Sequence, residues 1–365
     1  MSYDTAASHS SLQMIMSAAS PETLRSVRMQ MQDDLMDQFA SLHIEKWNQR
    51  VGEMHDAVLK QAVALCEQQL VEEGFGSPPA DYAFVVFGSA GRREQTLGSD
   101  QDNGFVLADH DIEDEEVHRY FALFGQRLSA ILEIAGYPPC PGNVMVTNPL
   151  WRKTSLEWSR QLASWRNEPG WEQVRYLMIA ADLRHISGNP DLTAEVRNAM
   201  YTLFEQESKL QEPFTAAVLR NTLRHKAALN VLGQVITEQV GEHAGEFDVK
   251  YGLYLPIVNA VRYLAVEYGI QASSTMERLS QLNQLDAVPF RWVESCQTAF
   301  HAALRFRSIT AVKAGEGEQT GSGYLPQSLL KQKEIRQELR EALSTVKLMY
   351  RTLQRQQRYR ERKWL

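Results

Sequence analysis

Long segments of helical periodicity flank a few short apolar runs in this chain of 365 residues. Ser20 followed by Pro21 is typical of a helix start, because serine caps the first turn and proline fits its first position. From there to Glu73 the sequence is helical in character, and an apolar residue recurs every fourth position on one face: Met54, Val58, Ala62, Cys66 and Leu70. We expect residues 1–75 to form a helical leader whose apolar face packs against the next domain or against a partner subunit.

The short apolar runs after the leader predict a small α/β unit. Residues 82–87 and 104–108 are short and apolar, which favours buried strands. Residues 117–135 have the spacing of an amphipathic helix, and a turn rich in Pro and Gly at 136–142 separates it from a third expected strand at 143–147. Strand, turn, strand, helix and strand in this order indicate a small mixed sheet with flanking helices.

Three tryptophans follow at intervals of seven residues, namely Trp151, Trp158 and Trp165. Seven residues make two helical turns, so the indoles fall on nearly one side. The spacing fits either a buried core or a platform for stacking bases, and we favour the core. From about Thr193 onward the pattern is almost entirely helical, which predicts an α/β domain at 76–195 followed by an all-α helical bundle at 196–365.

The composition excludes several classes of protein. The net charge is −7, from 38 basic and 45 acidic residues, so neither a nucleic-acid partner nor binding to an anionic membrane is expected. No segment has the length of a membrane span, and the N-terminus does not resemble a signal peptide. The three cysteines are isolated and have no metal-type spacing, which fits a reducing compartment. We expect a cytoplasmic protein.

Candidate chemistry lies between the first two expected strands. Asp100 and Asp102 stand one residue apart at the head of the second strand, and side chains two apart on a strand point the same way. Such a pair can hold two Mg²⁺ ions that clamp the attacking and leaving oxygens of a nucleotidyl transfer. The alternative is an acidic surface loop that only caps the strand. The conjunction with a Gly-Ser turn at the end of the first strand favours the catalytic interpretation.

The Gly-Ser turn has the residues that bind phosphate. Gly88 allows close approach of the backbone, and the Ser89 hydroxyl with nearby N–H groups can bind phosphate oxygens. Gly91 and Arg92 are expected to begin a short helix whose N-terminus is partially positive. Arg92 could reach the triphosphate or hold an aspartate, and we interpret Glu94 as a structural ion-pair partner rather than a ligand.

These motifs resemble a known superfamily. GSAGRREQTLGSDQDNGFVL is similar to the GS-x-GR-x-E…SD-x-D core of the polymerase-β-like nucleotidyltransferases. It most resembles the N-terminal domain of protein-PII uridylyltransferases and the nucleotidyltransferases found behind cyclic-nucleotide-binding and CBS domains. DVKYG and LPIVNAVRYLAVEYGI resemble the helical substrate-binding domain associated with them. The resemblance covers about residues 50–350. Where those relatives carry sensory domains, we expect this chain to have only the short helical leader.

The resemblance implies phosphate binding by Gly88 and Ser89, with Ser99 of SD-x-D beside the nucleotide, and Mg²⁺ (or Mn²⁺) at the two aspartates. Many enzymes of this fold carry a third acid on the following strand, but 143–147 has none. Asp182 is the best candidate to take the place of this third acid. It could equally form an ion pair with Arg184 or cap the turn at Gly188.

Lys250 stands in DVKYG, where the resembling domains carry a D-x-K pattern. That match suggests a contribution of Lys250 to the cleft between the domains, as part of the nucleotide site. A lysine in a helical domain otherwise faces water.

The leading hypothesis is a metal-dependent nucleotidyltransferase that moves UMP or AMP from an NTP to a hydroxyl of a protein or small molecule. The alternative is a module that senses NTP and Mg²⁺ without transfer. An interaction scaffold without nucleotide affinity fits poorly, because both motifs are intact. The expected partners are an NTP and the acceptor, with no membrane, and the oligomeric state is open, a homodimer included.

Overall fold

The computed structural model describes residues 10–109, 115–205, 212–224, 228–230, 233–311 and 321–362. The chain divides into two compact units. The first unit comprises residues 1–163 and 182–200, and the second comprises residues 164–181 and 201–365. Each unit is described below by itself.

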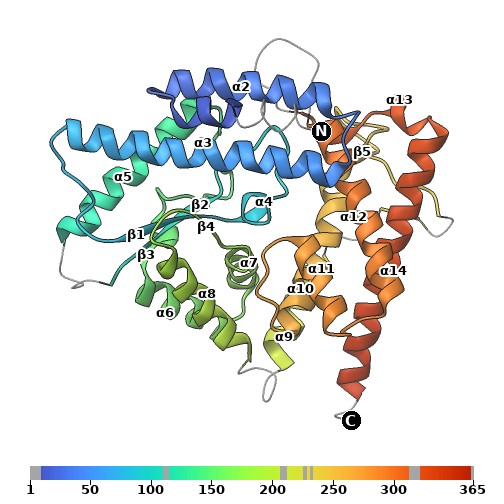
Figure 1. Cartoon of the computed structure of the whole chain (residues 1–365). Helices are drawn as coiled ribbons and strands as arrows, with labels where there is room; N and C mark the ends of the chain where they lie inside the picture. Colours follow the sequence, from blue (N-terminus) through green and yellow to red (C-terminus); the bar gives the residue numbers. More distant parts are fainter. Residues whose placement is uncertain are drawn as a thin grey trace. The chain divides into compact units, whose positions relative to one another are not determined.

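A four-stranded sheet forms the centre of the first unit (Figure 1). Its strands are β1 (Tyr82–Val86), β2 (Asn103–Leu107), β3 (Arg152–Thr154) and β4 (Arg184–Gly188), in the spatial order β3-β2-β1-β4. β1 is antiparallel to both β2 and β4, whereas β2 and β3 are parallel. The sheet is therefore mixed, which confirms the expected α/β class. β1 and β2 lie within one residue of the predicted strands.

The strand expected at 143–147 is wrong, because this segment is a loop and the next strand is β3. Asn143 has a φ of +54°, in the left-handed region that strands do not use. The N–H of Val146 donates to the side chain of Asn103 at 2.9 Å rather than to the backbone of a neighbouring strand. Val144 and Val146 are buried all the same. The apolar run thus fills the core without joining the sheet.

The leader folds onto the sheet domain as part of the first unit. Ser20 caps α2 (Pro21–Gln38) by accepting from the N–H of Thr23 at 3.2 Å, as predicted. The five apolar residues predicted on one face of α3 (Ile44–Glu72) are all fully buried. This helix contacts α2, β4 and α5 (Glu115–Ile134), and Figure 1 shows the blue pair α2 and α3 running above the strands.

Two of the spaced tryptophans belong to the core of the first unit, as predicted. Trp151 ends a short 3₁₀ helix (Pro149–Trp151), Trp158 lies on α6 (Ser155–Asn167), and both are fully buried. Their ring centroids are 5.9 Å apart, and the Trp151 ring lies 4.9 Å from that of Phe87 at the end of β1. Trp165 is also buried, in the second unit, where it packs on Tyr176 of α7 (Trp171–Ala180).

The C-terminal part is mostly helical, which confirms the expected second half of the fold. Its helices are α8 (Pro190–Glu205), α9 (Glu212–Thr222), α10 (Leu255–Glu267), α11 (Thr275–Gln284), α12 (Phe290–Thr310), α13 (Gln327–Leu330) and α14 (Lys333–Arg362). A two-stranded ribbon of β5 (Phe247–Asp248) and β6 (Tyr324–Leu325) and a π-helical turn (Lys250–Tyr254) interrupt them. Within the described ranges, no helix combines the length and hydrophobicity that crossing a membrane requires.

Candidate active site

Antiparallel pairing of β1 and β2 brings the Gly-Ser turn beside the aspartates. The last pair of the ladder is Val86 with Asn103, and one residue further the N–H of Phe87 donates to the carbonyl of Asp102 at 3.0 Å. Gly88 therefore lies against Asp102. A Cβ on Gly88 would stand 2.5 Å from Oδ2 of Asp102, and its φ of +54° also favours glycine. The two motifs form one site because the strands that carry them are neighbours.

The Gly-Ser turn is a single helical turn, α4 (Gly88–Gly91). The helix therefore begins at Gly88 and ends at Gly91, and the prediction that a helix begins at Gly91 is wrong. The first N–H groups of a helical turn have no acceptor within it, so this turn presents donors next to the Asp102 carboxylate. Ser89 is half-buried, and its hydroxyl makes no hydrogen bond to the residues that the structure describes. Donors of this kind can bind phosphate oxygens.

Three potential metal-ligating side chains meet in front of this turn. Asp100, Asp102 and Cys140 each offer one ligand atom, and these atoms lie within 4.8 Å of one another. Two carboxylates with converging oxygens fit a hard divalent cation such as Mg²⁺. Burial, and next the charge of Asp102, raise the pKa of the Cys140 thiol to about 12. The thiol is thus protonated near neutral pH in the protein without a cation.

Sequence reasoning missed Cys140. It stands 38 residues beyond Asp102, and its spacing to other cysteines and histidines has no metal-binding signature. Ser99, which was predicted, lies beside the cluster with its hydroxyl already engaged. It accepts from Nε2 of Gln95 at 2.9 Å and donates to the carbonyl of Asp100 at 3.3 Å. In this conformation Ser99 orders the loop that carries Asp100.

Asp182 lies directly beneath the Gly-Ser turn. Its side chain is fully buried and pairs with Nη1 of Arg92 at 2.5 Å, while Nε of Arg92 donates to Glu94 at 2.8 Å. The carbonyl of Asp182 lies so close to Gly91 that a Cβ there would overlap it. Asp182 does not belong to the cluster of ligand atoms around Asp102.

Arg184 does not pair with Asp182, so that predicted alternative is wrong. Its guanidinium forms two hydrogen bonds with Asp56 of α3, at 2.7 and 2.8 Å, and also donates to the carbonyl of Ala90 in the Gly-Ser turn. Arg184 thus binds the turn through Ala90, and Arg92 directly follows the turn in the chain. Both connect it to carboxylates that lie far away in sequence.

The leader orders the loop that joins the Gly-Ser turn to the aspartates, a role that the sequence did not reveal. Three successive carbonyls of this loop, at residues 95–97, accept hydrogen bonds from leader side chains. The donors are Asn48 to Gln95, His55 to Thr96, and both Arg28 and Gln32 to Leu97. Because buried carbonyls require partners, the leader fixes the path of the chain into Asp100.

His55 is fully buried between the leader and the loop at residues 95–97. Its Nε2 lies 2.8 Å from the carbonyl of Thr96, which can only accept, so Nε2 carries the proton. Its Nδ1 then accepts from the hydroxyl of Tyr137 at 2.6 Å. Burial, and next the positive charge of Arg28, lower the pKa of His55 to about 3. The imidazole is therefore neutral in the folded protein.

Lys250 belongs to the second unit, where it begins the π-helical turn. It is exposed, and its ammonium lies 5.7 Å from the centroid of the Tyr251 ring. The neighbouring Asp248 accepts from the N–H of Tyr251 at 2.8 Å. π-Helical turns are frequent at functional sites. The role of Lys250 in a cleft between domains stays a prediction.

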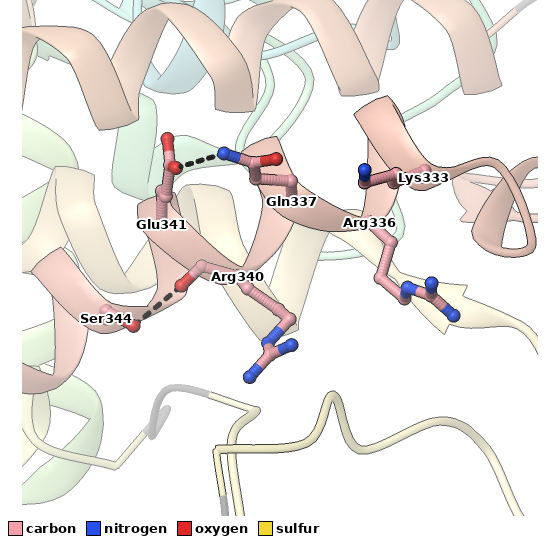
Figure 2. A pocket seen from close by; sticks show the side chains of 6 residues that line it. All are labelled: Lys333, Arg336, Gln337, Arg340, Glu341 and Ser344. Atoms are coloured by element: carbon pink, nitrogen blue, oxygen red, sulfur yellow. Dashed lines mark hydrogen bonds between the residues drawn. The ribbon is translucent and has the colours of Figure 1, made fainter.

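A basic hollow of about 590 Å³ lies on α14 in the second unit. Figure 2 shows the side chains that line it: Lys333, Arg336, Gln337, Arg340, Glu341 and Ser344. The only acid among them, Glu341, accepts a hydrogen bond from Gln337 at 3.0 Å. None of the three basic side chains forms an ion pair with another described residue. The hollow therefore suits a negatively charged group.

Comparison with known proteins agrees with this geometry. Residues 28–172 match the family described as "Putative nucleotidyltransferase DUF294". Residues 212–357 match the family described as "Putative nucleotidyltransferase substrate binding domain". The first match contains both motifs of the site, and the second contains Lys250 and the basic hollow on α14. No curated protein matches the chain.

Proposed function

Because the chain belongs to the DUF294 nucleotidyltransferase family and carries its substrate-binding domain, we propose that it transfers a nucleoside monophosphate, UMP or AMP, from an NTP to a hydroxyl group of a protein or small molecule. The observation that carries this proposal is the contact between Gly88 and Asp102. It joins a phosphate-binding turn to a pair of carboxylates. Nucleotidyl transfer needs both at one point.

In this proposal, different residues of the first unit bind the triphosphate and the cation. The N–H groups of α4 and the Ser89 hydroxyl bind triphosphate oxygens and orient the α-phosphorus. Asp100 and Asp102 would hold the divalent cation, Mg²⁺ or Mn²⁺. When bound, such a cation offsets the charge of the triphosphate and of the leaving pyrophosphate.

The transfer itself is a displacement at phosphorus. The acceptor oxygen bonds to the α-phosphorus as the bond to the bridging α–β oxygen breaks. Pyrophosphate leaves with that electron pair, and the hydroxyl proton passes to solvent. In-line positioning of the two reactants supplies most of the acceleration expected of such a site.

Asp182 acts as a positioning residue in this proposal rather than as the general base. A fully buried carboxylate that pairs with Arg92 beneath the turn cannot reach an acceptor hydroxyl. It instead fixes Arg92, and through the packing of Gly91 it fixes the turn. Among the described residues the ligand cluster holds two carboxylates, so a site that binds NTP and senses it without transfer is the second candidate.

We place the acceptor in the second unit, whose family is named for substrate binding. The basic hollow on α14 favours an acceptor that carries negative charge beside its hydroxyl. A cluster of two arginines and a lysine binds phosphate or carboxylate groups well.

The test uses NTPs labelled at the α-phosphate, each of the four bases in turn, with Mg²⁺ and candidate acceptors. The control is the Asp100→Asn/Asp102→Asn double variant. Label that moves to an acceptor in the native protein and not in the variant supports transfer. Tight, cation-dependent NTP binding with no labelled product and no pyrophosphate would instead establish the sensing role.

A further inference from the structure

The loop that carries Cys140 is attached to the chain on both sides of Asp102. The N–H of Gln101 donates to the carbonyl of Pro138 at 3.0 Å, and the N–H of Asn103 donates to the carbonyl of Val144 at 3.0 Å. These two amides flank Asp102. The intervening loop therefore runs alongside the backbone at Asp102.

Contacts within the loop hold Cys140 in place. Its N–H donates to the sulfur of Met145 at 3.2 Å, and its carbonyl accepts from the N–H of Asn143 at 2.9 Å. Asn143 has a left-handed φ of +54°, which closes this tight turn. The Cys140 side chain is half-buried, and its sulfur lies within 4.8 Å of a carboxylate oxygen of both Asp100 and Asp102.

We propose that Cys140 is a third protein ligand of the cation held by Asp100 and Asp102, and that its sulfur makes this site favour Zn²⁺ or Co²⁺ relative to Mg²⁺. The inference rests on the proposed function only for the place of the cation. Carboxylates alone suit hard ions such as Mg²⁺, whereas a thiolate adds affinity for softer ions. On binding, the S–H bond breaks, the sulfur bonds to the cation and the proton passes to solvent.

The other two cysteines provide the contrast. Cys66 lies fully buried on α3, where its thiol donates to the carbonyl of Phe124 at 3.7 Å, and Cys296 lies fully buried on α12. Neither belongs to a cluster of ligating side chains among the described residues. A spectroscopic signal from thiolate coordination must therefore come from Cys140.

The experiment titrates the full-length protein with Co²⁺ and follows the charge-transfer absorption that a thiolate ligand produces. We expect this absorption in the native protein and in Cys66→Ala. Cys140→Ser should lose the absorption and bind Co²⁺ about tenfold more weakly or worse, with Mg²⁺ binding little changed. Serine keeps a donor for Asp102 but lacks the soft sulfur, so this variant separates ligation from simple positioning of the carboxylate.

Further variants keep the outcome decisive. Cys140→Ala repeats the test without any donor, and urea denaturation of each variant shows that it is folded. Co²⁺ bound without the absorption, or an absorption that persists in Cys140→Ser, would overturn the role of Cys140. Nucleotide transfer could continue in either case, so the proposed function would stand. Conversely, the absorption without any nucleotide transfer would support Cys140 as a cation ligand and contradict the proposed enzymatic function.

Discussion

Oδ2 of Asp102 lies 2.5 Å from the point at which a Cβ on Gly88 would stand. No other residue type can occupy position 88 without moving this carboxylate. The contact explains why the Gly-Ser turn begins with glycine. It follows from the neighbouring positions of β1 and β2 in the sheet.

Gly88→Ala should therefore abolish cation-dependent NTP binding. The positive φ alone costs about 1–2 kcal/mol in stability for an L-residue, and the added methyl group also displaces Asp102. Gly74→Ala is the matched control, because Gly74 has a φ of +87° with nothing within 4 Å of its would-be Cβ. Calorimetric titration with an NTP and Mg²⁺ measures the difference. Equal binding by both variants would contradict the contact.

The buried pair of Arg92 and Asp182 should contribute strongly to stability. Asp182→Asn leaves Arg92 with one carboxylate partner fewer, and breaking a buried ion pair costs about 3–5 kcal/mol. The double variant Arg92→Met/Asp182→Leu should recover only part of that loss, since it removes both charges of this pair but also takes the Arg92 partner from the buried carboxylate of Glu94. Urea denaturation gives the free energy of unfolding of each variant. Additive losses would show that the pair is not coupled.

Acid should destabilise the protein through His55. The pKa of His55 is about 3 in the folded protein and about 6.5 when unfolded, so between these values the unfolded chain binds the extra proton. Stability is fully present above pH 6.5 and falls by about 1.4 kcal/mol for each pH unit as the pH drops toward 3. His55→Gln should lack this component, whereas His43→Gln, at an exposed position, should retain it. Thermal unfolding across this pH range checks the slope.

The leader should control the order of the loop at residues 95–97. Asn48→Ala removes the donor to the buried carbonyl of Gln95, at a cost of about 1–3 kcal/mol. We expect faster hydrogen exchange of the amides from 94 to 101 and a higher KM for the NTP. Gln49→Ala, on the exposed side of the same helix, is the control. Unchanged exchange in this loop would show that the leader does not fix it.

The basic hollow on α14 should bind the acceptor and not the nucleotide. Reversing its three cations with Lys333→Glu/Arg336→Glu/Arg340→Glu should raise the KM for a negatively charged acceptor on the order of tenfold, because exposed ion pairs contribute modestly. The KM for the NTP should not change. Arg351→Glu, exposed on the same helix outside the hollow, is the control. A change in the KM for the NTP alone, with the KM for the acceptor unchanged, would contradict binding of the acceptor at this hollow.

Local patterns in the sequence determined much of the fold and the part of the candidate site formed by the Gly-Ser turn and the two aspartates. The cap at Ser20, the apolar face of α3 and the strands β1 and β2 depend on neighbours a few residues away, so periodicity and turn residues were enough. The positions of the Gly-Ser turn after β1 and of the aspartates before β2 also followed from the pattern, whereas the contact of Gly88 with Asp102 depends on the pairing of the two strands.

Only the tertiary structure decided the rest. The segment at 143–147 stays outside the sheet, and the N–H of Val146 donates instead to the side chain of Asn103, distant in sequence. Asp182 binds Arg92, Cys140 reaches the aspartates, and leader side chains order the loop at 95–97. Each of these contacts joins residues tens of positions apart. Periodicity records which side of an element is buried, but it carries no information on which distant side chain packs against it.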